Sequence, residues 1–253
     1  MKVTILIPTF NQSPAFLRAA LMSARHQTHP CEIIVVDDGS TPRQDGVVES
    51  VLEGYSAEHD EGAGPRVEAK YVWQENKGVA GALNRALEDA TGEWIRWLPS
   101  DDLFTLASTE DLVRAAQTHQ DFRIVYSGYV EGIPTGSREI PAVTYTSRER
   151  LFDMLRQHCF INAATVMWHR DVFEGVGNWN ENMVHAQDYE FLLRCAEAYN
   201  FLGVSDPLVR RRVHAGQMLN TLTDPAEKLK KQRDMEFIRE RYGAAGHVWL
   251  PDE

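Results

Sequence analysis

Acidic side chains at three points of this sequence could carry chemistry together. Asp37 and Asp38 directly follow one apolar run, and Asp101 and Asp102 directly follow another. Adjacent carboxylates after a buried strand suit a hard cation, because Mg²⁺ and Mn²⁺ prefer carboxylate oxygen atoms. The third point is Asp188 at the start of a helical pattern, where a carboxylate could take a proton from an attacking hydroxyl group. These residue types indicate a cation-assisted transfer reaction with one acid as general base.

Other polar groups stand near these acids and would suit a nucleotide diphosphate. Pro8, Thr9 and Asn11 follow the first apolar run, and Lys77 directly precedes a helical pattern. A lysine and backbone N–H groups at the start of a helix could face phosphate. Each group also has a simpler explanation, since Asp and Gly favour turns and an acid before a helix can cap it. A site is favoured because the groups are expected on one edge of a sheet.

The first hundred residues alternate strand-like and helix-like patterns, which predicts successive βαβ units. Short apolar runs predict buried parallel strands, and apolar residues at helical spacing predict the helices between them. The predicted strands are Val3–Ile7, Ile33–Val36, Val67–Trp73 and Trp94–Leu98, and the predicted helices begin at Ser13-Pro14 and cover Val79–Ala90. The expected fold class is therefore α/β, with a doubly wound and mostly parallel sheet. In such sheets ligands bind beyond the carboxyl ends of the strands, where these polar groups lie.

The second half of the chain is less regular. A Gly- and charge-rich stretch, residues 54–66, is interpreted as a surface loop, and residues 131–145 as a loop or hairpin. The remaining predicted elements are helices at Ser108–His119, Gln187–Ala198 and Pro225–Arg241 and strands at Ile124–Tyr129, Ala163–Trp168 and Leu208–Val213. We expect this half to be smaller and irregular.

Composition limits the function classes. The net charge of −11 argues against a nucleic-acid partner, because duplex binding depends on clustered Lys and Arg. Only three cysteines occur, far apart, which favours a reducing, cytoplasmic compartment. The sequence contains no run of about 18 apolar residues, so we expect no membrane span. The basic stretch Pro207–Arg241 leaves peripheral contact with an anionic membrane open, although a solvated helix face explains it more simply.

The order of six short motifs resembles the inverting family 2 glycosyltransferases of the GT-A fold. The resemblance extends from residue 3 to about residue 217, and six motifs in matching order and spacing are more specific than any one of them. The motifs are IPTFN at 7–11, VVDDGS at 35–40, ENKGVAGALNRALEDATGEWI at 75–95, SDD at 100–102, AQDYEFLLR at 186–194 and VRRRVHAGQ at 209–217. The family fold implies a Rossmann-like nucleotide-binding core.

The resemblance also implies roles for individual residues. The segment Pro8 to Asn11 and Asp38 would form the pocket for the nucleotide base, with Asp37 supporting the turn. Asp101 would lie on the ribose side, and Asp102 would bind a Mn²⁺ or Mg²⁺ ion that bridges to the diphosphate. His214 matches a histidine that approaches the metal or the diphosphate, and Asp188 occupies the position of the catalytic base.

The resemblance implies an inverting glycosyltransferase, with a UDP-sugar as the favoured donor and a glycan or lipid-linked glycan as the acceptor. We expect residues 1–222 to form one GT-A domain, with a nucleotide-sugar half at 1–103 and an acceptor half at 104–222. Residues 223–253 would be a C-terminal helical extension. The alternatives are a nucleotidyltransferase that makes sugar nucleotides and a non-catalytic nucleotide-binding protein.

Some assignments stay open at the sequence level. Glu190 is a rival for the general base, although residues i and i+2 of a helix do not share a face. Asp188 could instead only cap its helix. Trp168, Trp179 and His185 lie in the expected acceptor half, where an aromatic ring could stack on a sugar, but burial in the core is the commoner role of tryptophan.

Overall fold

The computed structural model describes residues 1–52, 68–133, 136–214 and 224–244. The predicted loop at 54–66 and the last part of the C-terminal extension lie outside these residues. The helices are α1 (Pro14–Arg25), α2 (Asp45–Leu52), α3 (Gly78–Asp89), α4 (Ser108–Thr118), α5 (Arg148–Gln157), α6 (Arg170–Val176), α7 (Gln187–Ala198) and α8 (Pro225–Tyr242). The strands are β1 (Val3–Thr9), β2 (Cys31–Asp37), β3 (Glu68–Trp73), β4 (Trp94–Trp97), β5 (Leu103–Phe104), β6 (Ile124–Ile133), β7 (Gly136–Ile140), β8 (Val166–His169) and β9 (Phe201–Arg211).

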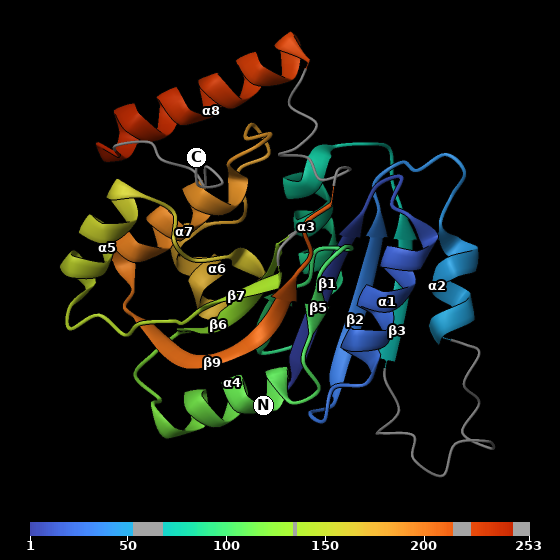
Figure 1. Cartoon of the computed structure of the whole chain (residues 1–253), viewed down its shortest axis with the longest axis horizontal. Helices are drawn as coiled ribbons and strands as arrows, with labels where there is room; N and C mark the ends of the chain where they lie inside the picture. Colours follow the sequence, from blue (N-terminus) through green and yellow to red (C-terminus); the bar gives the residue numbers. More distant parts are fainter. Residues whose placement is uncertain (53–67, 134–135, 215–223, 245–253) are drawn as a thin grey trace.

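The first four strands form a parallel sheet in the order β3-β2-β1-β4. The carboxyl ends of β1, β2 and β3 are in register, since Thr9 pairs with Asp37 and Asp37 pairs with Trp73, while β4 ends at Trp97 opposite Leu6 of β1. The polar residues that follow these strands therefore lie along one rim, as the alternating pattern predicted. Figure 1 shows this parallel half with α1 and α2 on one side of the sheet.

The sheet continues into the second half without a break, in the order β4-β8-β6-β9-β5. Here the pairing is mixed, because β4–β8, β6–β8 and β5–β9 are antiparallel while β6–β9 is parallel. The predicted strand at 208–213 is the end of the longer curved strand β9, and residues 131–145 contain the β6–β7 hairpin. The predicted strand at 163–168 begins with a short 3₁₀ turn, Ala163–Thr165, before β8. The α/β class with a doubly wound, mostly parallel sheet is confirmed.

Alternation along the buried strands divides the core between the two faces of the sheet. Val3, Ile5 and Ile7 of β1 pack into one cluster with apolar residues of α1, α2 and α4. Leu6 of β1 packs into the other with apolar residues of α3, α5, α6, α7 and α8. Because successive side chains of a strand point to opposite faces, one strand supplies both clusters.

Four aromatic rings fill the core between β8, α6 and α7. Trp168 and Trp179 are at most 2% exposed, and their rings contact Phe173 and Phe191 at centroid distances of 4.9–6.5 Å. The two tryptophans are therefore core residues and offer no ring to a sugar, which decides between the two roles considered for them.

Helix α8 lies across the outer side of α7 at one end of the molecule (Figure 1). Its Met235, Ile238 and Tyr242 are buried in the same cluster as α7. The described part of the C-terminal extension is thus packed on the domain core. No helix among the described residues has the length and hydropathy needed to cross a membrane.

Candidate active site

The rim at the end of β1 is built around a strained asparagine. Asn11 has a φ of 46°, a left-handed conformation that asparagine tolerates better than most residues. Its N–H donates to Ser40 Oγ at 2.8 Å, and its Oδ1 accepts from the Thr41 N–H at 2.9 Å. Asn11 therefore ties the end of β1 to the loop after β2.

Pro8 and Thr9 are buried within this rim. The Thr9 hydroxyl donates to Gln44 Oε1 at 2.6 Å, and Gln44 in turn donates to the Gln12 carbonyl at 2.6 Å. The structure thus places Pro8 and Thr9 beneath the loop, where they support it. Phe10, between Thr9 and Asn11, is 52% exposed and presents its ring at the surface.

The two acids after β2 have different surroundings. Asp37 is fully buried, and its carboxylate accepts from Ser40 N–H, Gln44 N–H and the Tyr71 hydroxyl at 2.7–2.9 Å. All three bonds lie within the protein, so Asp37 holds the turn. Asp38 is 3% exposed, and its Oδ1 accepts from the Gln74 amide at 2.7 Å. Burial raises the pKa of Asp38, although that amide and nearby backbone N–H groups favour its ionised form.

Lys77 precedes α3, as predicted, but its backbone amide is already engaged. The Lys77 N–H donates to Asp38 Oδ1 at 2.8 Å, which fastens the start of α3 to the end of β2. Its side chain is exposed. Of the Lys77 groups expected to meet phosphate, the amide is thus used inside the protein, and only the ammonium group is left for a ligand.

The acids after β4 lie together at the same rim. Asp102 is 4% exposed, and its Oδ1 accepts from the Arg212 N–H at 3.0 Å. Burial, and secondarily the neighbouring Asp101 charge, raise the pKa of Asp102 to about 7. The preceding Ser100 hydroxyl accepts from the Gln12 side chain at 3.3 Å, which links this loop to the end of β1.

His214 lies against Asp101, with Nε2 3.0 Å from Oδ2. The imidazole ring is held by Phe16 of α1, whose ring centroid is 4.7 Å away. The Arg212 guanidinium lies 5.0 Å from the same Phe16 ring. Phe16 therefore forms an aromatic platform for the end of β9, a role that helical spacing in α1 did not reveal.

The consecutive arginines at the end of β9 point in different directions. Arg210 pairs with Leu103 across the β5–β9 ladder and is exposed. Arg211 is directed to the other side, where it forms an ion pair with Glu131 of β6. This is the alternation expected of strand residues, and it means that only some of the three consecutive arginines can reach the rim.

Asp188 is the second residue of α7 and is half-buried. Its Oδ1 accepts from the Tyr189 N–H at 2.8 Å, while the helix has no side-chain cap at Ala186. Burial raises the pKa of Asp188, opposed by this N–H, by its own N–H and by the Arg211 charge. A carboxylate with a raised pKa is a stronger base than an ordinary aspartate.

Glu190 is held away from any such role. Its carboxylate forms an ion pair with Arg194 at 2.8 Å and accepts from the Tyr242 hydroxyl at 2.8 Å. Arg194 also donates to the Val176 and Asn178 carbonyls. Glu190 therefore anchors α7 to its neighbours, so Asp188 is the better placed of the two candidates for a general base.

The contacts form one continuous path along the rim. Asp38 holds the start of α3 and lies at the end of β2, whose following loop is bound to Asn11 through Ser40. Gln12, next to Asn11, binds Ser100. After Ser100, Asp102 is bound by the Arg212 N–H that follows β9. Arg211 at that end acts electrostatically on both Asp102 and Asp188. Asp102 and Asp188, which are 86 positions apart in the sequence, are thus both within electrostatic reach of one guanidinium group.

The residues at the rim suit a cation that is shared with a ligand. Among the described residues, no three His, Cys, Asp or Glu side chains converge to form a complete metal cage. Mg²⁺ usually binds one or two carboxylates together with substrate phosphates, so a partial set is the chemistry expected. Burial, together with the adjacent Asp101 charge, disfavours the ionised form of Asp102 and raises its pKa, and a bound cation would favour that form.

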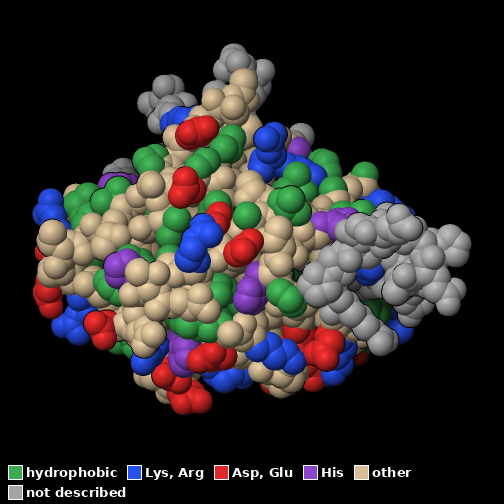
Figure 2. Space-filling model, turned by 90° about the horizontal axis from the view of Figure 1, so that it is seen from below, with side chains coloured by type: hydrophobic (Ala, Val, Ile, Leu, Met, Phe, Trp, Pro, Cys, Tyr) green, Lys and Arg blue, Asp and Glu red, His purple; other side chains and the backbone are tan. Residues whose placement is uncertain are grey.

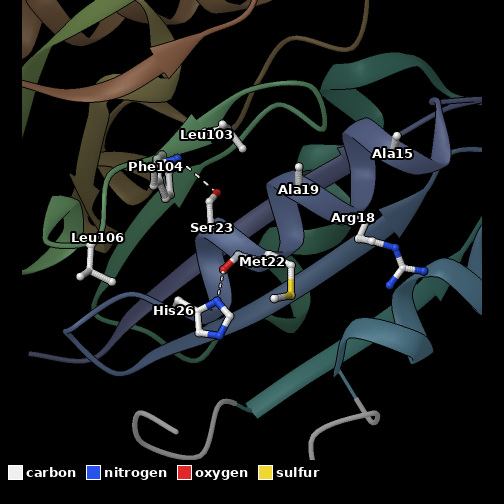
Figure 3. A pocket seen from close by; sticks show the side chains of 9 residues that line it. All are labelled: Ala15, Arg18, Ala19, Met22, Ser23, His26, Leu103, Phe104 and Leu106. Carbon is white, nitrogen blue, oxygen red and sulfur yellow. Dashed lines mark hydrogen bonds between the residues drawn. The ribbon is translucent and has the colours of Figure 1, made fainter. Parts of the chain in front are cut away.

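A groove of about 570 Å³ lies elsewhere, along a part of α1 that does not include Phe16. Figure 3 shows its lining, in which Ser23 of α1 lies against Phe104, whose N–H donates to Ser23 Oγ at 3.2 Å. Met22 of α1, His26 just after α1, and Leu103 and Leu106 also line the groove. None of the predicted site residues line it. The groove is therefore separate from the candidate active site.

Two residues of the site escaped the sequence analysis. Gln44 and Phe16 act through tertiary contacts, with the Thr9 hydroxyl and the His214 ring respectively. Phe10 lies within the Pro8 to Asn11 segment that the resemblance assigned to the base pocket, and its exposed ring has no core to fill.

Comparison with known proteins agrees with this geometry. The model of the family "Glycosyl transferase family 2" matches residues 4–177, more than half of the chain. An uncharacterised glycosyltransferase of Rickettsia typhi is 28% identical, over 99% of this chain and 78% of its own length. The chondroitin synthase of Pasteurella multocida is 27% identical over 84% of this chain, and the matched region is 20% of that enzyme's length.

Solved structures share the fold. Staphylococcus aureus TarS in complex with UDP-GlcNAc superposes with a TM-score of 0.67 at 19% identity, over 96% of this chain and 73% of that one. The mannosyltransferase PcManGT of Pyrobaculum calidifontis, in complex with GDP-Man and Mn²⁺, has a TM-score of 0.66 at 19% identity, over 94% and 63% of the two chains. The family assignment favours glycosyl transfer over the nucleotidyltransferase and the non-catalytic binding protein considered above. This chain is a glycosyltransferase that belongs to glycosyl transferase family 2.

Proposed function

We propose that this enzyme transfers a sugar, with inversion at the anomeric carbon, from a nucleotide-diphosphate donor to a hydroxyl group of a glycan or lipid-linked glycan. Asp188 is the general base in this proposal. The observation that carries it is the path of contacts that gathers Asp38, Asp101 and Asp102 at one rim, together with the half-buried Asp188 at the uncapped start of α7.

The donor occupies the rim from β2 to β4. The exposed Phe10 ring offers a stacking surface for the base, and Asp38 offers a carboxylate to an N–H group of that base. Uracil and guanine carry such a donor group, and we favour UDP. The related folds TarS and PcManGT bind UDP-GlcNAc and GDP-Man respectively, which supports a sugar-nucleotide donor for this chain. Asp101 lies on the ribose side, and the exposed Lys77 side chain can meet phosphate.

A divalent cation, Mn²⁺ or Mg²⁺, would neutralise charge on the diphosphate, and Asp102 with His214 would hold it. The presence of Mn²⁺ with the donor in PcManGT supports this part of the proposal. Arg211 and Arg212 add positive charge on the side where the leaving nucleoside diphosphate gains negative charge.

The reaction is a single displacement. The acceptor oxygen forms a bond to the anomeric carbon as the bond from that carbon to the diphosphate oxygen breaks. The Asp188 carboxylate takes the proton of the acceptor hydroxyl, and the nucleoside diphosphate leaves with the electron pair. Because nucleophile and leaving group lie on opposite sides of the carbon, the configuration inverts.

The acceptor half, residues 104–222, supplies Asp188 in this proposal, and residues 1–103 bind the donor. A cytoplasmic location with peripheral contact to a membrane suits a lipid-linked acceptor. The face shown in Figure 2 carries Lys and Arg side chains interspersed with Asp and Glu.

The test is Asp188→Asn, which keeps the shape of the side chain and removes the base. A screen of UDP-, GDP- and dTDP-sugars for Mn²⁺-dependent hydrolysis first identifies the donor. We expect the variant to lose at least about 100-fold in kcat, while calorimetry shows unchanged Mn²⁺-dependent binding of the nucleoside diphosphate. Asp121→Asn, at an exposed position, is the matched control. Normal turnover of the Asp188→Asn variant would remove Asp188 from this role.

A further inference from the structure

Helix α8 places a buried acid against the segment that leads into α7. Asp234 is 4% exposed, although aspartate is seldom fully buried. Its Oδ2 accepts from the backbone N–H groups of Val184 and His185 at 2.8 and 2.7 Å. A carboxylate that accepts backbone N–H groups makes charge-assisted bonds, which are stronger than bonds between neutral groups.

The residues held by Asp234 stand directly before the catalytic position. His185 is three positions before Asp188, and the start of α7 at Ala186 has no side-chain cap of its own. The direction in which the first turn of α7 presents Asp188 therefore depends on how the preceding segment is held.

Two more contacts from α8 hold the same region. His185 Nε2 lies 2.8 Å from Glu227 Oε2, with the imidazole side chain only 3% exposed. Farther along α8, the Tyr242 hydroxyl donates to Glu190, two positions beyond Asp188. Helix α8 thus fixes the chain on both sides of Asp188 without contributing a group that was assigned to the donor.

We propose that Asp234 is a positioning residue for Asp188, so that the C-terminal helix α8 sets the geometry of the general base. This inference rests on the proposed function, in which Asp188 accepts the proton. The donor groups Asp38, Asp101 and Asp102 come from the ends of β2 and β4 and are held by other contacts. Loss of Asp234 therefore changes turnover and leaves donor binding unaltered.

The size of the effect follows from geometry. A displacement of about 1 Å of a reacting group can cost up to about 100-fold in rate. Removing both hydrogen bonds of Asp234 leaves two N–H groups without their acceptor and frees the segment before α7. The expected loss in kcat is about 10- to 100-fold.

The experiment compares Asp234→Ala and Asp234→Asn in the full-length enzyme. The substrate is the sugar nucleotide chosen by the Mn²⁺-dependent hydrolysis screen, and binding is measured by calorimetry with its nucleoside diphosphate and Mn²⁺. We expect Asp234→Ala to lower kcat about 10- to 100-fold, with KM for the donor and the calorimetric Kd within about twofold of wild type. Asp234→Asn keeps one oxygen acceptor in place and should recover at least about threefold of that loss. Glu236→Ala, on the exposed face of the same helix, should match wild type.

Three results would overturn the inference. One is a kcat of Asp234→Ala within twofold of wild type. Another is a parallel loss of turnover and donor binding, which would mark a general structural role. The third applies if the Ala variant does not fold, and it is a kcat of Asp234→Asn within twofold of wild type.

Asp188→Asn is assayed in parallel so that the two proposals can fail separately. If that variant turns over normally, the proposed base is wrong whatever the Asp234 variants do. If it is inactive while both Asp234 variants are normal, the base assignment stands and only the positioning role of α8 is lost.

Discussion

Asp102 and Asp188 are both acids in low-polarity surroundings, but neighbouring charges differ. The Asp101 carboxylate adjoins Asp102 and adds to the effect of burial on the pKa of Asp102. The ionised form of Asp188 is instead favoured by first-turn N–H groups of α7. A negative charge near a helix N-terminus is stabilised by the helix dipole. Asp188 is thus suited to carry a negative charge that stays free to accept a proton. Asp102 is suited to carry a negative charge that a bound cation would compensate.

The raised pKa of Asp102 predicts a pH-dependent stability. Its pKa of about 7 in the folded protein lies above the ordinary value of 3.8, so the folded state holds more protons than the unfolded chain between those limits. The contribution of Asp102 to stability therefore falls as pH rises through this window. In EDTA, we expect Asp102→Asn to be more stable than wild type at pH 8, by on the order of 1–3 kcal/mol.

The comparison is made by urea unfolding between pH 4 and pH 8. The advantage of Asp102→Asn should shrink as pH falls toward 4, because protonating wild-type Asp102 in the folded state costs little near the ordinary pKa of 3.8. Asp121→Asn serves as an exposed control and should show no such trend. A constant difference at all pH values would contradict the electrostatic explanation.

At the scale of elements, α3 connects the donor rim to the core. Its first residues are tied to Asp38 through the Lys77 N–H, and its buried face packs on β1 and β2. Leu83 on that face is 0% exposed, whereas Glu88 on the same helix is exposed. The helix thus connects the packed core to the loop that holds Asp38.

Truncation of Leu83 tests the contribution of α3 to stability. We expect Leu83→Ala to lower the free energy of unfolding by about 2–5 kcal/mol, because it removes buried apolar surface and leaves a cavity. Glu88→Ala should change it by less than about 0.5 kcal/mol. Urea unfolding followed by circular dichroism measures both, and equal effects of the two variants would show that the α3 face does not carry the packing.

At the scale of the whole molecule, the sheet and its two clusters join the parallel half of the sheet, its mixed half and α8. One cluster includes Leu83 of α3, Phe191 of α7 and Ile238 of α8. Since the halves share their core, neither has a complete core by itself. This arrangement keeps the donor rim and Asp188 in one rigid frame.

A shared core predicts cooperative unfolding. We expect tryptophan fluorescence and far-UV circular dichroism to report one coincident urea transition. Leu83→Ala and Ile238→Ala, from the donor half and from α8, should both move that single transition to lower urea. Two separate transitions, each sensitive to one of the variants, would show that α8 folds independently.

The family, the parallel half of the sheet and the acids at its rim could be predicted from the sequence alone. Buried parallel strands leave a local signal, a short apolar run, and their carboxyl ends meet wherever the chain goes next. The positions of Asp37, Asp38, Asp101 and Asp102 at one rim therefore followed from counting strands. Helix α7 could also be predicted from local sequence, because Phe191, Leu192 and Cys195 repeat at helical spacing.

Features that depend on distant partners became visible only in the folded chain. Strand β9 contains Gly203 and Pro207, which weaken its local signal, and Pro207 is accommodated where the β6–β9 register shifts opposite Gly128. The short helices α2, α5 and α6 were missed for a similar reason, since packing more than periodicity stabilises them. Tyr242 binds Glu190, and Asp234 binds the segment before Asp188. Both contacts join residues about 50 positions apart. Such contacts have no local pattern, because they are selected by the way α8 packs on α7.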